Sequence, residues 1–130
     1  MFSAARHLTH SSHETIGSLT ALLWGLWVLL PWDTFRASPT VWRIVAELTP
    51  EPLAGGLWIG IGALSLAALL GDWRRIRAGC AVVRCGLWTL VSIGLILVAP
   101  TSTGSVVYPM FALGSAWTFL TVMAEWKRYE

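Results

Sequence analysis

Long uncharged stretches alternate with short polar segments along the chain. No charged residue occurs in residues 15–32, 52–71 or 85–124. A bilayer core about 30 Å thick requires about 20 apolar residues in a helix, so each of the first two stretches fits one crossing. The third is about twice as long and is interrupted at Pro100-Thr101-Ser102-Thr103-Gly104-Ser105. We therefore expect an all-α, polytopic membrane protein with four transmembrane helices in one antiparallel bundle, approximately over residues 15–31, 51–72, 80–99 and 105–126.

Helix signals set these bounds. Pro50 and Pro52 are tolerated in a first turn, and Glu51 complements the positive end of the helix dipole there. We place the break between the second and third helices at Gly79. Pro109 lies near the start of the fourth helix, where it costs little.

The longest connection contains a predicted short amphipathic helix over residues 39–48. Ser38-Pro39 provides a start signal, and Ile44, Val45 and Leu48 share one face, with Arg43 on the other side. Such a helix lies either on the membrane surface or against the end of the bundle. The sequence leaves both placements open.

Composition agrees with a membrane protein. Apolar residues make up 55% and charged residues 12% of the 130 residues, whereas soluble domains average about 25% charged. A soluble all-α bundle is the alternative, but residues 57–70 and 87–99 lack the polar face that its helices would show. The net charge of +2 is too small to indicate nucleic-acid binding. Cys80 and Cys85 match neither a redox nor a zinc spacing.

Basic residues predict the orientation. With four crossings, one side of the membrane carries Arg6, Arg74, Arg75, Arg77, Arg84, Lys127 and Arg128, and the other only Arg36 and Arg43. The positive-inside rule then places both termini in the cytoplasm. We assign topology or headgroup contacts to Arg74, Arg75, Arg77, Arg84, Lys127 and Arg128. Arg84 lies about one turn inside the third helix, from where its side chain can extend to the headgroups. A buried functional arginine is the alternative.

Small residues predict where helices pack closely, because packing rather than the hydrophobic effect joins helices in lipid. The candidates are Gly17, Ala21 and Gly25 in the first helix, Gly56, Gly60, Ala63, Ala67 and Gly71 in the second, and Ala112 and Ala116 in the fourth. The second helix has them on more than one face, which indicates a central position or self-association. The expected partners are the lipid bilayer and either a second copy or another membrane protein.

Candidate chemistry is sparse. Glu14 and Asp33 flank the first helix as boundary markers, and no carboxylate, histidine or lysine lies deep in a predicted span. No nucleophile is accompanied by a base, so we expect neither an enzyme nor a cofactor. His7, His10 and His13 repeat every three residues and could bind a metal weakly, but a flexible tail is the preferred interpretation. The Arg74-Arg75-Ile76-Arg77 segment could bind anionic headgroups, although its topological role already explains it.

Aromatic residues are frequent, with nine tryptophans. Trp32, Trp58 and Tyr108 lie near the predicted outer boundary and Trp73 and Trp126 near the inner one, as amphipathic rings prefer. Four others lie deeper: Trp24, Trp27, Trp88 and Trp117. The deeper rings either face neighbouring helices and lipid or form a ligand-binding box.

Two turn segments carry a resemblance to a known group. With Leu29-Leu30-Pro31-Trp32-Asp33-Thr34-Phe35, followed by Ser38-Pro39, and with Ala99-Pro100-Thr101-Ser102-Thr103-Gly104, the chain resembles small four-helix membrane proteins of tailed bacteriophages and prophages. The resemblance would cover most of the chain and implies a host inner-membrane location. It transfers no active site.

Three functions are compatible with these features. The first is a non-enzymatic membrane protein that acts by assembly or by binding a membrane partner, such as a phage accessory protein. The second is a holin-like permeabilising protein, suggested by the small size, the several crossings and the short charged tail at residues 125–130. The third is a small channel or transporter, whose polar path would use Ser18, Thr20, Ser65, Thr89, Ser92, Ser115, Thr118 and Thr121.

Overall fold

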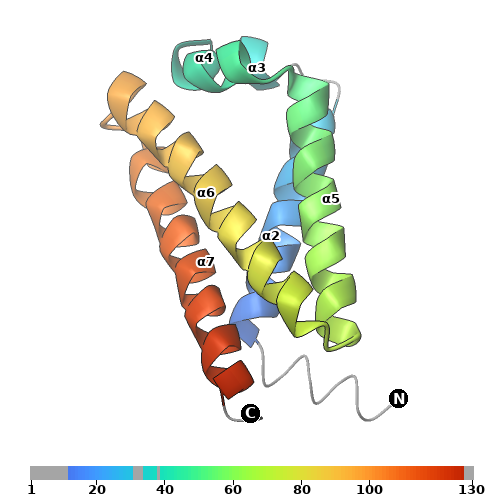
Figure 1. Ribbon diagram of the computed structural model, residues 1–130. Coiled ribbons are helices and arrows are strands. Elements are labelled where there is room, and N and C mark those ends of the chain that lie inside the picture. Colours follow the sequence, from blue (N-terminus) through green and yellow to red (C-terminus); the bar gives the residue numbers. More distant parts are fainter. Residues whose placement is uncertain (1–11, 31–33, 38, 128–130) are drawn as a thin grey trace.

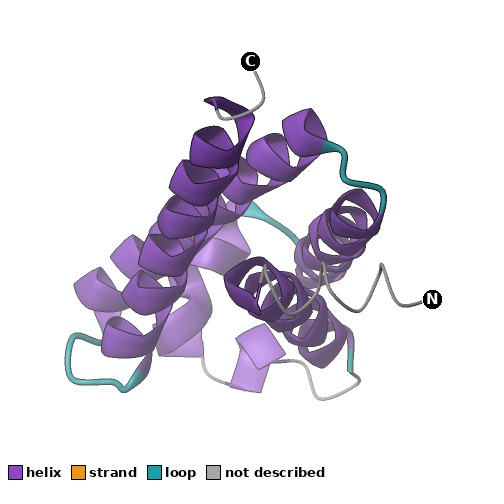
Figure 2. Ribbon diagram, turned by 90° about the horizontal axis from the view of Figure 1, so that it is seen from below, coloured by secondary structure: helices purple, strands orange, loops and turns teal. Residues whose placement is uncertain are grey.

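The computed structural model describes residues 12–30, 34–37 and 39–127 of the chain (Figure 1). These residues form helices joined by short connections, with no strand among them, which confirms the all-α class (Figure 2). The helices are α2 (Ser12–Leu29), α3 (Thr34–Ala37), α4 (Pro39–Leu48), α5 (Glu51–Leu70), α6 (Arg74–Val98) and α7 (Gly104–Lys127).

Three of these helices are long and apolar enough to cross a membrane. They are α5, α6 and α7, with 20, 25 and 24 residues. At 1.5 Å per residue they are about 30, 37 and 36 Å long, against a hydrocarbon core of about 30 Å. Helix α2 has 18 residues, begins with the polar segment Ser12–Thr15 and is not among the three. The described residues thus support a membrane protein.

The long helices form two pairs. Helix α2 lies along α5, and α6 lies along α7 (Figure 1). The two pairs meet at the end that holds the start of α2, the α5–α6 connection and the end of α7. They diverge toward the other end, where α3 and α4 lie across the top of the molecule in this view. The two pairs therefore contact each other directly at the first end, while α4 packs against α6 at the other end.

Close contact between α2 and α5 depends on glycine. A Cβ atom added at Gly25 would lie 2.7 Å from the backbone of Gly55 and Ile59, and one added at Gly62 would lie 2.7 Å from the Leu22 nitrogen. Real Cβ atoms do not approach backbone this closely, so larger residues at these positions would separate the helices. Glycine allows the backbones to approach, as in tightly packed membrane helices.

The α5–α6 connection is shorter than the sequence analysis expected. We predicted that the third helix begins near Cys80 after a break at Gly79, but α6 begins at Arg74 and contains Gly79. The reversal is made by Gly71-Asp72-Trp73, where Asp72 has a left-handed φ of 51°. Aspartate adopts this conformation more readily than most residues. A single glycine inside a helix costs about 1 kcal/mol and does not by itself end it.

Helix α4 has the predicted bounds and packs against the bundle. Trp42 is buried, and a Cβ added at Gly94 of α6 would meet Ile44 and Val45 at 3.6–4.0 Å. On its exposed side, Arg43 pairs with Glu47 at 3.2 Å. Of the two placements that the sequence left open, the structure shows contact with the end of the bundle.

Candidate functional site: a buried ion-pair cluster and an exposed small-residue face

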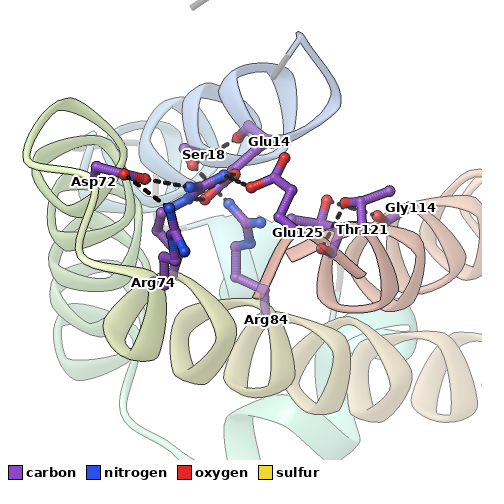
Figure 3. A network of polar contacts seen from close by, with 10 residues as sticks. Glu14, Ser18, Asp72, Arg74, Arg84, Gly114, Thr121 and Glu125 are labelled. Carbon is purple, nitrogen blue, oxygen red and sulfur yellow. Dashed lines mark hydrogen bonds and ion pairs between the residues drawn. The ribbon is translucent and has the colours of Figure 1, made fainter. Parts of the chain in front are cut away.

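A cluster of charged residues lies where the two helix pairs meet. We call it the polar cluster: Glu14, Ser18, Asp72, Arg77, Arg84 and Glu125 (Figure 3). Its residues come from α2, the α5–α6 connection, α6 and α7. The cluster therefore joins both helix pairs.

Arg77 is the centre of the polar cluster and is only 4% exposed. Its Nε donates to Glu14 Oε1 at 3.0 Å, and its Nη2 donates to Glu14 Oε2 at 2.8 Å. Its Nη1 donates to Asp72 Oδ1 at 2.9 Å, and its Nη2 reaches Glu125 Oε2 at 3.2 Å. One guanidinium thus connects three carboxylates.

Glu14 is as deeply buried as Arg77, with 4% of its surface exposed. The sequence analysis treated it as a boundary marker outside the first span. The structure instead includes it in α2, which begins at Ser12 rather than near Thr15, and turns it toward α6. A carboxylate in the first turn complements the helix dipole, and a buried one is tolerated when it is paired and hydrogen-bonded.

Arg84 points into the protein rather than toward the headgroups. It is 1% exposed, and its Nη1 donates to Ser18 Oγ at 2.7 Å. The Ser18 hydroxyl in turn donates to the Glu14 carbonyl oxygen at 2.7 Å. A Cβ added at Gly17 would lie 3.4 Å from Arg84 Cζ, so the missing side chain of Gly17 leaves room for the guanidinium. The predicted headgroup contact of Arg84 is corrected accordingly: α2 offers it space and an acceptor inside the bundle.

The charges of this region balance. The carboxylates of Glu14, Asp72 and Glu125 pair with the Arg77 guanidinium, and Arg74 lies 3.7 Å from Asp72. Arg84, bonded to Ser18, adds a third positive charge. Opposed charges with hydrogen bonds lower the cost of removing each from water. Within the described residues, the Nε of Arg84 has no hydrogen-bond partner. The carboxylates of this cluster already accept hydrogen bonds from Arg77. The arrangement is therefore more typical of an ion-pair network that holds helices together than of a reactive site.

Aromatic rings fill the interior toward the other end of the molecule. Trp58 and Trp88 are 3% and 1% exposed, with ring centroids 4.0 Å apart. Trp24 lies 5.1 Å from Trp58 and donates its Nε1–H to the Tyr108 hydroxyl at 3.3 Å. This aromatic cluster consists of Trp24, Phe35, Trp42, Trp58, Trp88, Tyr108 and Phe111. The rings contact one another directly, as in a packed core. Trp42 and Tyr108 also line a cavity of about 300 Å³ beside the α6–α7 connection.

One face of α5 is packed and another is open. Gly55 and Gly62 face α2, as described above. Gly56 and Gly60 are exposed, and a Cβ added at either would meet no atom of the described chain within 4 Å. Ala63 and Ala67 are also exposed. We call Gly56, Gly60, Ala63 and Ala67 the outer face of α5.

The other small-residue candidates have varied environments. Gly17 lies under Arg84, Ala21 is fully buried, and Gly25 contacts α5. Gly71 belongs to the α5–α6 connection, while Ala112 and Ala116 are half-buried in α7. The sequence analysis did not single out Gly55 and Gly62, although their seven-residue spacing places them on one helix face.

The remaining predicted residues add no further site. Arg75 and Lys127 are exposed, and Arg74 is half-buried. Arg128, His7 and His10 lie outside the described residues, and His13 is exposed at the start of α2. Among the residues that the structure describes, no group of three or more His, Cys, Asp or Glu side chains is placed to hold a metal.

Most hydroxyl groups considered for a polar path bond to their own helix. The donors to a carbonyl oxygen four residues earlier are Ser18, Thr89, Ser92, Ser115 and Thr118. Hydroxyls bonded in this way are satisfied without water, as is usual in packed helices.

No protein family, curated protein or solved structure matches the chain. Its function is therefore inferred from the contacts within the molecule.

Proposed function

We propose that the chain is a non-catalytic integral protein of a bacterial inner membrane that acts by assembling with a membrane partner through the outer face of α5. A second copy of the chain is the first candidate for that partner. In this proposal α2, α5, α6 and α7 cross the bilayer four times as an antiparallel bundle, with both termini in the cytoplasm. The resemblance to phage membrane proteins agrees with this location and suggests an accessory role in a phage or prophage.

The fourth crossing is assigned to α2 because of its contact with α5. The glycine contacts join residues 18–29 of α2 to residues 55–62 of α5. A helix packed this closely against a transmembrane helix shares its environment, and 18 residues give α2 a length of about 27 Å. Its buried carboxylate, Glu14, is paired with Arg77, which lowers the cost of its position.

The observation that carries the assembly proposal is the outer face of α5. Glycine inside a helix is about 1 kcal/mol less favourable than alanine, and an exposed glycine gains nothing from its own fold. In lipid, however, small residues at four-residue spacing let a second helix approach closely. The inward face of the same helix already shows this use, since Gly55 and Gly62 admit the backbone of α2. Gly56 and Gly60 offer the same geometry with no partner from the described chain.

The interior favours assembly over conduction. The ionisable groups between the helix pairs bond to one another, and aromatic rings fill the opposite end. Glu125, counted in the charged tail that suggested a holin, belongs to the polar cluster. These contacts give the permeabilising and transport hypotheses less support than the assembly hypothesis.

Cysteine crosslinking in native membranes tests the proposal. In a background with Cys80→Ala and Cys85→Ala, Gly60→Cys places a thiol on the outer face of α5. Gly114→Cys is the matched control, because Gly114 is also exposed and its Cβ position is also open. We expect mild oxidation to link Gly60→Cys to a second copy or to one defined membrane protein, and to leave the control uncrosslinked. Crosslinking no stronger from Gly60→Cys than from Gly114→Cys would overturn the proposal.

A further inference from the structure

A groove runs along the outer surface between α6 and α7, away from the polar cluster. It has a volume of about 680 Å³, and its lining is almost entirely apolar, including Val82, Leu90 and Phe119. Two small residues, Gly86 and Ala116, also line it. A Cβ added at Gly86 would meet nothing in the described chain within 4 Å. The groove therefore has room for an elongated apolar group.

Beyond the groove, the same helix faces continue to a cation at the end of the helix pair that carries the polar cluster. On α6, Arg75, Gly79, Val82, Gly86 and Leu90 recur every three or four residues and are all exposed, so they form one stripe along the helix. On α7, the same spacing connects Ala116 and Phe119 to Met123 and Trp126. The helices α6 and α7 lie side by side (Figure 1). Val82, Gly86, Leu90, Ala116 and Phe119 line the groove, and both stripes continue past it along their helices.

Arg75 and Trp126 meet where these stripes end. The Arg75 Cζ lies 5.7 Å from the centroid of the Trp126 ring. A guanidinium over an indole face is held in place by the ring. It keeps its charge, and most of its N–H groups can still donate hydrogen bonds to a ligand. Exposed Lys127 follows Trp126 directly. The apolar groove and, about 10 Å beyond Val82 along α6, a positively charged group thus lie on the same side of the helix pair.

The distance along α6 from Arg75 to Gly86, about 16 Å, matches one leaflet of a bilayer. Helix α6 is about 37 Å long, which exceeds the hydrocarbon core of about 30 Å. The excess places Arg75 at headgroup level. Val82 and Gly86 then lie about 10 and 16 Å further along the helix axis, a length similar to the adjoining half of the hydrocarbon core, whereas Leu90, about 22 Å along, lies past the midplane.

We infer that this groove binds an anionic phospholipid, with one acyl chain along Gly86 and the phosphate on Arg75. Charge complementarity selects an anionic headgroup, because guanidinium groups bind phosphate with paired hydrogen bonds. The apolar length of the groove selects a lipid rather than a free phosphate ion. The inference depends on the proposed membrane placement but not on assembly through α5, which uses a different helix.

Lipid retention by the purified full-length chain tests this inference. The protein is delipidated in nonionic detergent and titrated with phosphatidylglycerol or phosphatidylcholine of the same acyl composition, and bound lipid is counted by native mass spectrometry. One basic residue near a phosphate contributes about 1 kcal/mol, so we expect about a fivefold preference for phosphatidylglycerol. Arg75→Gln should remove this preference while phosphatidylcholine still binds. Gly86→Leu should reduce retention of both lipids by filling the groove.

Matched controls separate these effects from general damage. Arg43→Gln removes an exposed arginine of α4, and Gly114→Leu adds the same side chain at another open glycine. Both should retain lipid as the wild type does. Equal binding of the two lipids by the wild type, or an unchanged preference in Arg75→Gln, would overturn the inference. A Gly86→Cys variant that crosslinks to a protein in membranes would also overturn it, since a partner helix would then occupy the groove. The α5 crosslinking result is independent of each outcome.

Discussion

Replacing Arg77 with methionine removes the guanidinium that joins the two helix pairs. Three carboxylates lose their partner, but they differ in exposure. The side chains of Asp72 and Glu125 are 44% and 38% exposed, so water can replace much of what they lose. The Glu14 side chain is 5% exposed and has no such access.

The magnitude follows from this difference. Removing one partner of a buried ion pair costs about 3–5 kcal/mol, because the other charge is left buried without compensation. Exposed pairs contribute about 0–1 kcal/mol each. We therefore expect Arg77→Met to lower the free energy of unfolding by about 3–5 kcal/mol, most of it from Glu14. Adding Glu14→Leu removes the stranded charge, so the double variant should be more stable than Arg77→Met alone.

The free energy of unfolding can be measured from the loss of helical circular dichroism as sodium dodecyl sulfate is titrated into protein in mild detergent micelles. Arg43→Met is the control, because Arg43 pairs with Glu47 while 74% of its side chain is exposed. It should change the free energy by less than about 0.5 kcal/mol. The reasoning is refuted if Arg77→Met is no more destabilising than this control, or if Glu14→Leu adds to the loss instead of relieving it.

Three further predictions use other parts of the molecule. Gly62→Leu should abolish folding in the same titration, because its Cβ would lie 2.7 Å from the Leu22 nitrogen, whereas Gly114→Leu, at an open position of α7, should keep the wild-type midpoint; equal midpoints would contradict the α2–α5 packing. Trp88→Ala should cost about 3–5 kcal/mol by removing a buried ring, and a loss below about 1 kcal/mol would show that the aromatic cluster is not a core. Alkaline phosphatase should be active when fused after Ser102 and inactive when fused after Lys127; the reverse pattern would contradict the orientation.

Much of the fold follows from the sequence because the bilayer dictates the length of apolar segments. The predicted bounds of the last helix, 105–126, differ by one residue at each end from Gly104–Lys127, and those of the loop helix agree. The start signal at Ser38-Pro39 and the apolar face of Ile44, Val45 and Leu48 predict the latter. The predicted start of α6 is wrong, because the chain reverses at Asp72, whose backbone has a left-handed φ, and not at Gly79.

The polar cluster could not be predicted in the same way. Glu14 and Arg77 are 63 residues apart, and their contact depends on how α2 turns toward α6. The positive-inside rule counts residues near span ends and does not report which way their side chains point. A signal was nevertheless present, because Arg77 and Arg84 are seven residues apart and share one face of α6, as Glu14 and Ser18 share one face of α2.

The shared face of Arg77 and Arg84 has a consequence for the rest of α6. A charged side chain facing lipid in the hydrocarbon region is costly, whereas both guanidinium groups find acceptors inside the bundle. These two residues therefore fix the rotation of α6 about its own axis. Gly86 is two positions after Arg84 and therefore points to the opposite side of α6. With this rotation, Gly86 and the exposed residues in line with it on α6 face the lipid. The polar cluster and the groove are thus coupled, and changing Arg84 to a residue that prefers lipid should alter access to the groove as well as stability.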